Sequence, residues 1–456
     1  MRTNFEIERR EALKRIGVGG GLLLGGGVSL EAHEQETLLS HPSTKKHARI
    51  VVIGAGTAGM IAAARIRRAA PNAQIVMIAP DTIHRYQSGA LFVAAGMATS
   101  AEYRRPTDSL LPDGVEWLRE RVVAFDPANN MLTAEKSGKV VYDILVVTLG
   151  AEYDYEAIEG LHADMIGKEG IASIYMDDTV GGDARGADAT RVLFEQIRSA
   201  APAAGKPLKV LFSEPRTPIK GRGSALSLMM LYNHMLKREG AQGRVTFDYM
   251  TAHTRLLELE AFDGVLKKEL KKHINIEAAY GKELVAVDAG AKKATFVHNG
   301  AKEEIAYDLL HVTPPLRAPQ VMRDSPLAVQ DGVQKGWMAV DPATLRHPDY
   351  GNVFGLGDVI ALPYAKSGGA AQHQGIILQD NIAAALEGEK LTFHYDGYTV
   401  SPVVTAYGKV LLAEYNTQNA LPTFFLNPYE PRVAWWLLQR YFMPWAYFNL
   451  LMRGMM

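Results

Sequence analysis

A glycine-rich turn between a short apolar strand and a helix constrains this chain more than any other feature of its sequence. A strand is expected over Arg49–Ile53, and the turn follows directly as Gly54-Ala55-Gly56-Thr57-Ala58-Gly59. A helical stretch then runs to about Ala70, and a second strand is expected over Gln74–Ala79. The first glycine permits the tight turn, the second lets a pyrophosphate approach the backbone, and the third lets helix and strand pack closely. We therefore predict an α/β fold that binds a dinucleotide at Gly54, Gly56, Thr57 and Gly59, with the helix N-terminus facing the phosphates.

One element of this fingerprint is displaced. An acidic residue about twenty positions after the last glycine usually binds the ribose hydroxyls. Here Ala79 stands at that place, and Asp81 follows two positions later. Either Asp81 binds the ribose, or backbone groups and water hold it.

Two later segments indicate that the dinucleotide is a flavin. Tyr142–Gly150 has the pattern of a buried strand ending in a Thr-x-Gly turn, and Asn352–Asp358 is another short strand with a Gly-Asp pair at its exit. A carboxylate at the carboxyl end of a strand is well placed to hydrogen-bond the sugar-alcohol chain of a flavin. We therefore expect FAD, with Gly150, Gly357 and Asp358 among its contacts.

Composition excludes several other kinds of chemistry. The 456 residues carry 49 basic and 50 acidic side chains, and this balance argues against a nucleic-acid-binding protein. There is no cysteine, which excludes disulfides, thiolate nucleophiles, cysteine-ligated zinc and iron–sulfur clusters. The 13 histidines form neither HxxxH nor HExxH spacing, so we expect no metal site.

Several blocks along the chain occur in an order that resembles one family. They are His84–Gly89, Tyr142–Gly150, Thr217–Lys220, His311–Pro315, Gly357-Asp358, Tyr395–Thr399, Tyr407–Lys409 and Pro444-Trp445. From about Arg49 to Gly454 the chain resembles the sulfide:quinone oxidoreductases, and most closely the branch that includes the mitochondrial enzymes. These are FAD flavoproteins with two dinucleotide-binding domains. The resemblance implies an FAD enzyme seated on a membrane that passes electrons from a reduced donor to a membrane quinone.

The expected architecture is two interleaved Rossmann-like domains and a C-terminal membrane foot. The FAD domain is discontinuous, with residues 48–165 and 300–385, and the second domain takes residues 166–299. Residues 386–456 form the C-terminal region with amphipathic, membrane-associating helices.

The resemblance also assigns three catalytic positions. Lys366 matches a family lysine expected near the flavin ring and the quinone pocket, although a solvated loop lysine is the alternative. Family members carry redox cysteines at two positions that Gly221 and Ser401 occupy here. Sulfide oxidation in the family needs a disulfide that sulfide can attack, and neither glycine nor serine can provide one. We therefore expect a donor other than sulfide, which the sequence does not identify.

Two other functions remain as alternatives. One is a catalytically degraded homologue that binds flavin and serves as a partner or structural subunit. The other, less favoured, is an NADH:quinone reductase. That enzyme would need a second glycine motif, whereas Leu208–Gly223 has a strand followed by Ser213-Glu214-Pro215.

The N-terminus has the pattern of an export signal. Arg9-Arg10 precedes a glycine-rich apolar run over Ile16–Leu30, which is typical of a twin-arginine signal. We expect a signal region over residues 1–32, a polar linker over 33–47, and a mature protein at the periplasmic face of the membrane. The alternative is a frayed helix of a cytoplasmic protein.

The C-terminus is aromatic and lacks a span long enough to cross a bilayer. Arg432–Met456 contains Trp435, Trp436 and Trp445, and Pro444 should divide it into two short helices. Aromatic helices with interspersed cations suit the headgroup boundary, so we expect the three tryptophans to contact lipid. The alternative is a helix docked on the core or at a subunit interface, as in a homo-oligomer.

Overall fold

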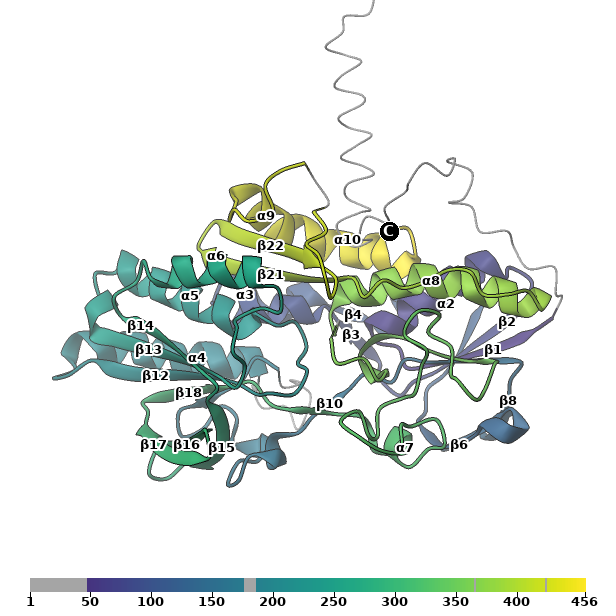
Figure 1. Cartoon of the computed structure of the whole chain (residues 1–456), viewed down its shortest axis with the longest axis horizontal. Helices are drawn as coiled ribbons and strands as arrows, with labels where there is room; N and C mark the ends of the chain where they lie inside the picture. The colour runs from purple at the N-terminus through teal and green to yellow at the C-terminus, as the bar shows by residue number, and fades with distance from the viewer. Residues whose placement is uncertain (1–46, 176–185, 365, 423–424) are drawn as a thin grey trace, which may run out of the picture.

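The computed structural model describes residues 47–175, 186–364, 366–422 and 425–456. Two α/β halves lie next to each other, and a C-terminal unit lies above both of them (Figure 1). The expected signal region and nearly all of the linker lie outside the described residues.

The first half is built on a five-stranded parallel sheet with the order β20-β9-β1-β2-β5. Its strands are β1 (Arg49–Ile53), β2 (Gln74–Ile78), β5 (Val115–Leu118), β9 (Ile144–Val147) and β20 (Val353–Gly355). The four residues of β9 are all buried, as expected for a parallel strand that is covered on both faces. Helices α2 (Thr57–Ala69) and α8 (Gly368–Glu387) pack closely, because Gly375 of α8 leaves room for Ile61 of α2.

Shorter elements surround this sheet. They are β3 (Ile83–Arg85), α3 (Ala90–Ala94), β4 (Arg104–Pro106), the antiparallel sheet β6 (Val122–Asp126), β7 (Met131–Ala134) and β8 (Gly138–Val141), and α7 (Gln320–Arg323). A two-stranded pair of β10 (Glu152–Tyr153) and β19 (Leu316–Arg317) lies between the halves (Figure 1).

The second half repeats the plan with the parallel order β11-β18-β12-β13-β14. Its strands are β11 (Ile171–Ala172), β12 (Leu208–Glu214), β13 (Val245–Thr251), β14 (Ile276–Tyr280) and β18 (Leu309–Val312). Its helices are α4 (Gly186–Ala200), α5 (Ser224–Arg238) and α6 (Glu260–Leu270), and β15 (Glu283–Asp288), β16 (Lys293–His298) and β17 (Ala301–Ala306) form an antiparallel sheet. The expected two Rossmann-like units are therefore present. However, β17 and β18 lie beyond residue 299, so the second unit extends further along the chain than expected.

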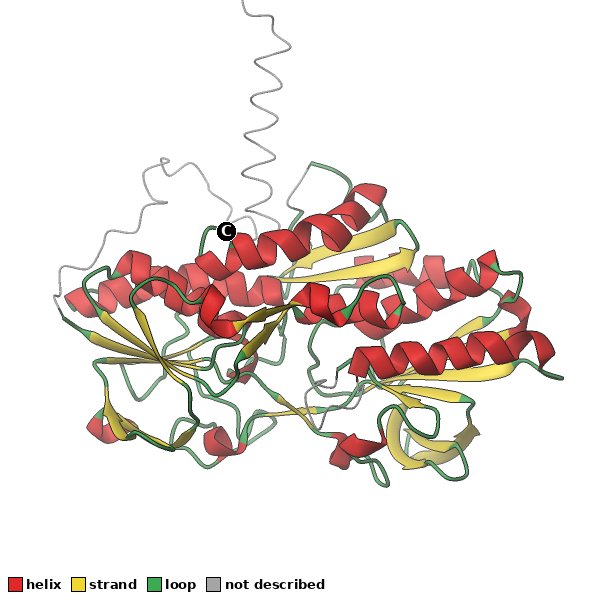
Figure 2. Ribbon diagram, turned by 180° about the vertical axis from the view of Figure 1, so that it is seen from behind, coloured by secondary structure: helices red, strands yellow, loops and turns green. Residues whose placement is uncertain are grey.

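The C-terminal unit connects the two halves. The hairpin β21 (Thr399–Ala406) and β22 (Lys409–Tyr415) packs on α5, since Val403 lies against Gly223 at the start of that helix. Helices α9 (Val433–Leu437) and α10 (Met443–Asn449) follow, and the chain end packs on α2, where Gly454 lies against Ala64. Figure 2 shows this unit above the helices that cover the sheets.

Candidate flavin site

The glycine turn is held in a conformation that side chains would prevent. Gly54 has φ +100°, and an ideal Cβ there would lie 2.5 Å from the carbonyl oxygen of Thr148. A Cβ on Gly59 would overlap the carbonyl oxygen of Gly54, whereas a Cβ on Gly56 would meet nothing within 4 Å. The Thr148 hydroxyl donates to the carbonyl oxygen of Ile53 at 2.6 Å and so ties β9 to the end of β1. The first and third glycines therefore serve packing, and the second leaves open space at the start of α2.

The Gly-Asp pair lies beside this turn, although it comes about 300 residues later in the chain. Gly357 has φ +78°, and a Cβ there would lie 2.7 Å from the Cβ of Ala58. Its amide donates to the Gln374 side chain at 2.9 Å. Gly150, with φ +70°, follows β9 and has open space around its Cα. Asp81 is exposed in the segment after β2.

Two lysines, the buried Lys366 and the partly buried Lys220, flank Asp358. Lys366 is 5% exposed, and its ammonium group donates to the carbonyl oxygens of Asp358 (2.7 Å) and Ile360 (3.3 Å) and lies 4.1 Å from the ring centre of Trp337. Burial lowers the pKa of Lys366 to about 8, opposed by Asp358 and reinforced by Lys220. Lys366 is therefore not a solvated loop lysine.

Lys220 is a site residue to which sequence reasoning assigned no role. Its ammonium group lies 3.6 Å from the Asp358 carboxylate and 4.9 Å from the ring centre of Tyr153. Burial alone would lower its pKa, but Tyr153 and Asp358 raise it overall. Membership in the Thr217–Lys220 block was the only signal for this residue in the sequence.

The resemblance implies redox cysteines at two further positions, Gly221 and Ser401. Gly221 follows Lys220, has φ +58°, and its amide donates to the carbonyl oxygen of Lys366 at 3.1 Å. Ser401 is buried on β21, and its hydroxyl lies 3.3 Å from that of Tyr415. Ser401 shares a strand face with Val403, which lies against Gly223. Gly221 thus contacts the Lys366 loop directly, whereas Ser401 lies on β21, the strand that packs on the start of α5 through Val403.

The second half carries a buried carboxylate where a second dinucleotide would approach. Glu214 ends β12, is 1% exposed, and accepts hydrogen bonds from Arg222 at 3.1 Å and from Tyr249. Burial raises the pKa of Glu214, and Arg222 opposes that shift. A carboxylate at this strand end disfavours a pyrophosphate, in agreement with the expected lack of a second glycine turn.

The C-terminal helices differ in part from expectation. Two short helices form, but a π-helical segment over Leu438–Phe442 joins them directly before Pro444. Trp435 and Trp436 are buried in the fold, Trp436 edge-on to Phe92 at 5.7 Å, so these two rings are not at the surface. Trp445 alone of the three is exposed. Helical periodicity in an aromatic-rich segment does not show which face docks on the core. Within the described ranges, no helix combines the length and apolarity needed to cross a membrane.

Comparison with known proteins identifies a matching domain family and several relatives of this chain. Residues 48–181 match the family model "Pyridine nucleotide-disulphide oxidoreductase". The mouse mitochondrial sulfide:quinone oxidoreductase is 29% identical over 416 residues, which cover 90% of this chain and 88% of the mouse protein. The Dictyostelium discoideum enzyme of the same name is also 29% identical over 416 residues, covering 90% and 87%. Homologues of this chain are sulfide:quinone oxidoreductases.

Two solved structures agree in fold. The Aquifex aeolicus sulfide:quinone oxidoreductase has a TM-score of 0.68 at 19% identity, covering 88% of this chain and 92% of its own. A chain from the mitochondrial ATP synthase of Tetrahymena thermophila has a TM-score of 0.74 at 20% identity, covering 91% and 98%. The sulfide:quinone oxidoreductase homologues and the matching domain are FAD-binding, and this protein is an FAD-dependent oxidoreductase.

The residues present fit FAD. The open face of Gly56 at the N-terminus of α2 leaves backbone amides available for a pyrophosphate, and Gly54 and Gly59 cannot carry side chains. Asp358 and Gly357 lie beside the same helix start and would hold the sugar-alcohol chain. Among the sequence-predicted residues, Gly59 lies against Gly54, Gly357 lies against Ala58 of the same turn, and Lys366 is hydrogen-bonded to both Asp358 and Gly221.

Proposed function

We propose that this protein is a membrane-associated flavoenzyme that passes electrons from a reduced donor other than sulfide to a quinone. The observation that carries the donor part is the composition of the two positions that match the family's redox cysteines. Gly221 has no side chain, Ser401 offers only a hydroxyl hydrogen-bonded to Tyr415, and the chain has no thiol elsewhere. Quinone as acceptor follows from the names of the homologues.

The protein's own groups supply charge and orientation around the flavin. When bound, FAD would supply the two-electron chemistry between donor and acceptor. Lys366 is fixed by two carbonyl oxygens and by the Trp337 ring, and Lys220 is fixed by Asp358 and Tyr153. Two fixed cations, one buried and one partly buried, favour negative charge nearby more strongly than solvated lysines would, because they need no reorganisation.

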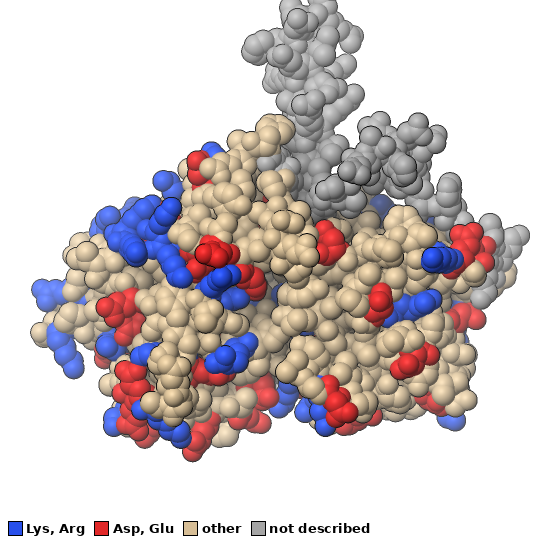
Figure 3. Space-filling view, in the orientation of Figure 1, with Lys and Arg blue, Asp and Glu red and all other residues tan. Residues whose placement is uncertain are grey.

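An exposed apolar stripe on the C-terminal helices supports the membrane part of the proposal. Val433, Leu437, Tyr441 and Trp445 follow one another at four-residue spacing, and each is between 52% and 58% exposed. The opposite face of the same helices carries Trp436 and Tyr447, which are buried. In Figure 3 the molecular surface over α9 carries few charged residues. An apolar stripe that includes aromatic residues, on a helix docked to the protein, is suited to the headgroup boundary of a membrane.

We also propose that the chain is exported to the periplasmic face of the membrane. The support is the Arg9-Arg10 pair followed by a short apolar run. Fractionation of cells that express the full chain, with and without Arg9→Lys and Arg10→Lys, tests this, and an unprocessed cytoplasmic protein in both cases would contradict it.

Flavin spectroscopy tests the reaction. The purified protein is mixed without oxygen with a panel of reduced donors, and loss of the visible flavin absorbance is followed. A soluble quinone analogue is then added. We expect at least one donor to bleach the flavin and the quinone to restore it. Bleached flavin that the quinone does not reoxidise would overturn the proposal and favour a degraded homologue.

A further inference from the structure

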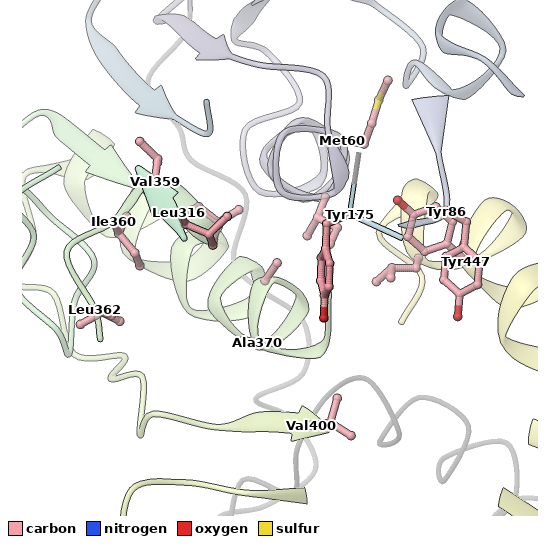
Figure 4. Close-up of a cluster of buried hydrophobic side chains, with 14 of the residues drawn as sticks. Met60, Tyr86, Tyr175, Leu316, Val359, Ile360, Leu362, Ala370, Val400 and Tyr447 are labelled. Carbon is pink, nitrogen blue, oxygen red and sulfur yellow. The ribbon is translucent and has the colours of Figure 1, made fainter. Parts of the chain in front are cut away.

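A tyrosine of the C-terminal helix α10 is hydrogen-bonded into the glycine turn. The Tyr447 hydroxyl lies 2.6 Å from the hydroxyl of Thr57, the first residue of α2, and 2.7 Å from Nε2 of His84. Nδ1 of His84 lies 2.9 Å from the carbonyl oxygen of Ala55, inside the turn. Figure 4 shows the Tyr447 ring beside Tyr86, and the two ring centres are 4.6 Å apart.

Donors and acceptors in this chain of contacts have one consistent order. Burial lowers the pKa of His84 to about 4, so its ring is neutral at ordinary pH. The Ala55 carbonyl can only accept, so the ring proton is on Nδ1 and Nε2 accepts the Tyr447 proton. The Tyr447 oxygen then accepts the Thr57 proton. Each donor therefore meets an acceptor, and the hydrogen bonds connect Tyr447 of α10 to Thr57 directly and to Ala55 through His84.

The rest of the chain end packs on the same helix. Arg65 of α2 donates to the carbonyl oxygen of Met456, and Arg68 donates to that of Arg453 at 3.2 Å. Gly454, with φ +64°, lies against Ala64. The segment that follows Tyr447 thus runs along α2, the helix whose N-terminus faces the expected pyrophosphate.

We infer that Tyr447 is a positioning residue for FAD, and that the C-terminal segment is a structural part of the flavin site. The turn must hold its amides toward the pyrophosphate, and Gly54 and Gly56 leave it few side-chain contacts of its own. Tyr447 and His84 fix the turn at Thr57 and Ala55. Binding to a turn that is already ordered avoids the entropic loss of ordering it. The inference holds whatever the donor, the acceptor or the membrane role.

Titration of apo-protein with FAD tests this in a set of full-length variants. Y447F removes the hydroxyl and keeps the ring, and T57V removes the other end of the same bond. We expect each to raise the Kd for FAD about ten-fold to hundred-fold, with no further increase in the double variant. T57S keeps the hydroxyl and should bind like wild type. Y429F is the matched control, because Tyr429 is an exposed tyrosine of the C-terminal unit whose ring packs on Phe262 of α6 rather than on the turn.

A stability control separates positioning from general weakening. V245A truncates a fully buried side chain of β13 in the second half, so it should lower the unfolding midpoint and leave the Kd for FAD unchanged. An unchanged Kd in Y447F, or an equal increase in V245A, would overturn the inference. If Y447F does not fold, T57V compared with T57S decides the matter from the turn side.

Discussion

The amide of Gly221 donates a hydrogen bond to the carbonyl oxygen of Lys366 at 3.1 Å, which joins α5's entry loop to the loop that carries the buried lysine. The resemblance to the sulfide:quinone oxidoreductases implies a redox cysteine at the first of these positions. Here it holds a residue with φ +58° and no side chain. A side chain introduced at this position would therefore start from backbone that is hydrogen-bonded to Lys366.

The first prediction concerns sulfide. Wild-type protein should show no sulfide-dependent quinone reduction above a reaction without enzyme, because no thiol can form the persulfide that the usual route requires. The measurement is quinone absorbance under anaerobic conditions, with the mouse enzyme as positive control. Appreciable turnover would refute our account of the site.

Restoring both thiols should restore part of that chemistry. Gly221→Cys with Ser401→Cys should gain sulfide-dependent bleaching of the flavin, and neither single variant should. The gain will be limited because φ +58° strains any side chain by roughly 1 kcal/mol, and because the new Cβ lies 3.1 Å from the Ser224 hydroxyl. No gain in a double variant that still binds FAD would mean that the pocket differs from the family's beyond these two positions.

Local and long-range features of this site were not equally predictable. The glycine turn, β1 and α2 follow from a pattern within some twenty residues, since each glycine answers a local steric need. Lys220–Asp358 and Tyr447–Thr57 join segments far apart in the chain, and no local pattern encodes such pairs. Trp436 illustrates a second limit, because composition predicted an aromatic surface whereas packing against Phe92 buries the ring.

Lys366 should make stability depend on pH in a defined window. Burial lowers its pKa in the folded protein from 10.5 to about 8. Below about pH 8 the group is protonated in both states, and the folded state bears the full penalty of the buried charge. Between about pH 8 and 10.5 the unfolded chain binds more protons than the folded protein, so the free energy of unfolding rises with pH.

The variant K366M isolates this effect. From pH 7.5 to 10, the unfolding free energy of apo wild type should rise relative to K366M by about 2 to 3 kcal/mol. The measurement is denaturant unfolding at both pH values, with K390M, an exposed lysine, as control. A constant difference between wild type and K366M would show that Lys366 does not lose its proton in this range.

Membrane association is best tested at the apolar stripe rather than by deleting the C-terminus. Removing residues 432–456 would also remove Tyr447 and its bond to Thr57, so loss of FAD and loss of lipid binding would be confounded.

Leu437→Glu with Trp445→Glu places charge on two half-exposed positions and leaves the buried face intact. We expect this variant to keep its flavin absorbance and to lose cosedimentation with lipid vesicles, because charge is excluded from the acyl boundary. Val123→Glu is the control, since Val123 is equally exposed on β6. Unchanged cosedimentation of the stripe variant would reject the foot, whereas equal loss in the Val123 variant would assign the binding to general surface hydrophobicity.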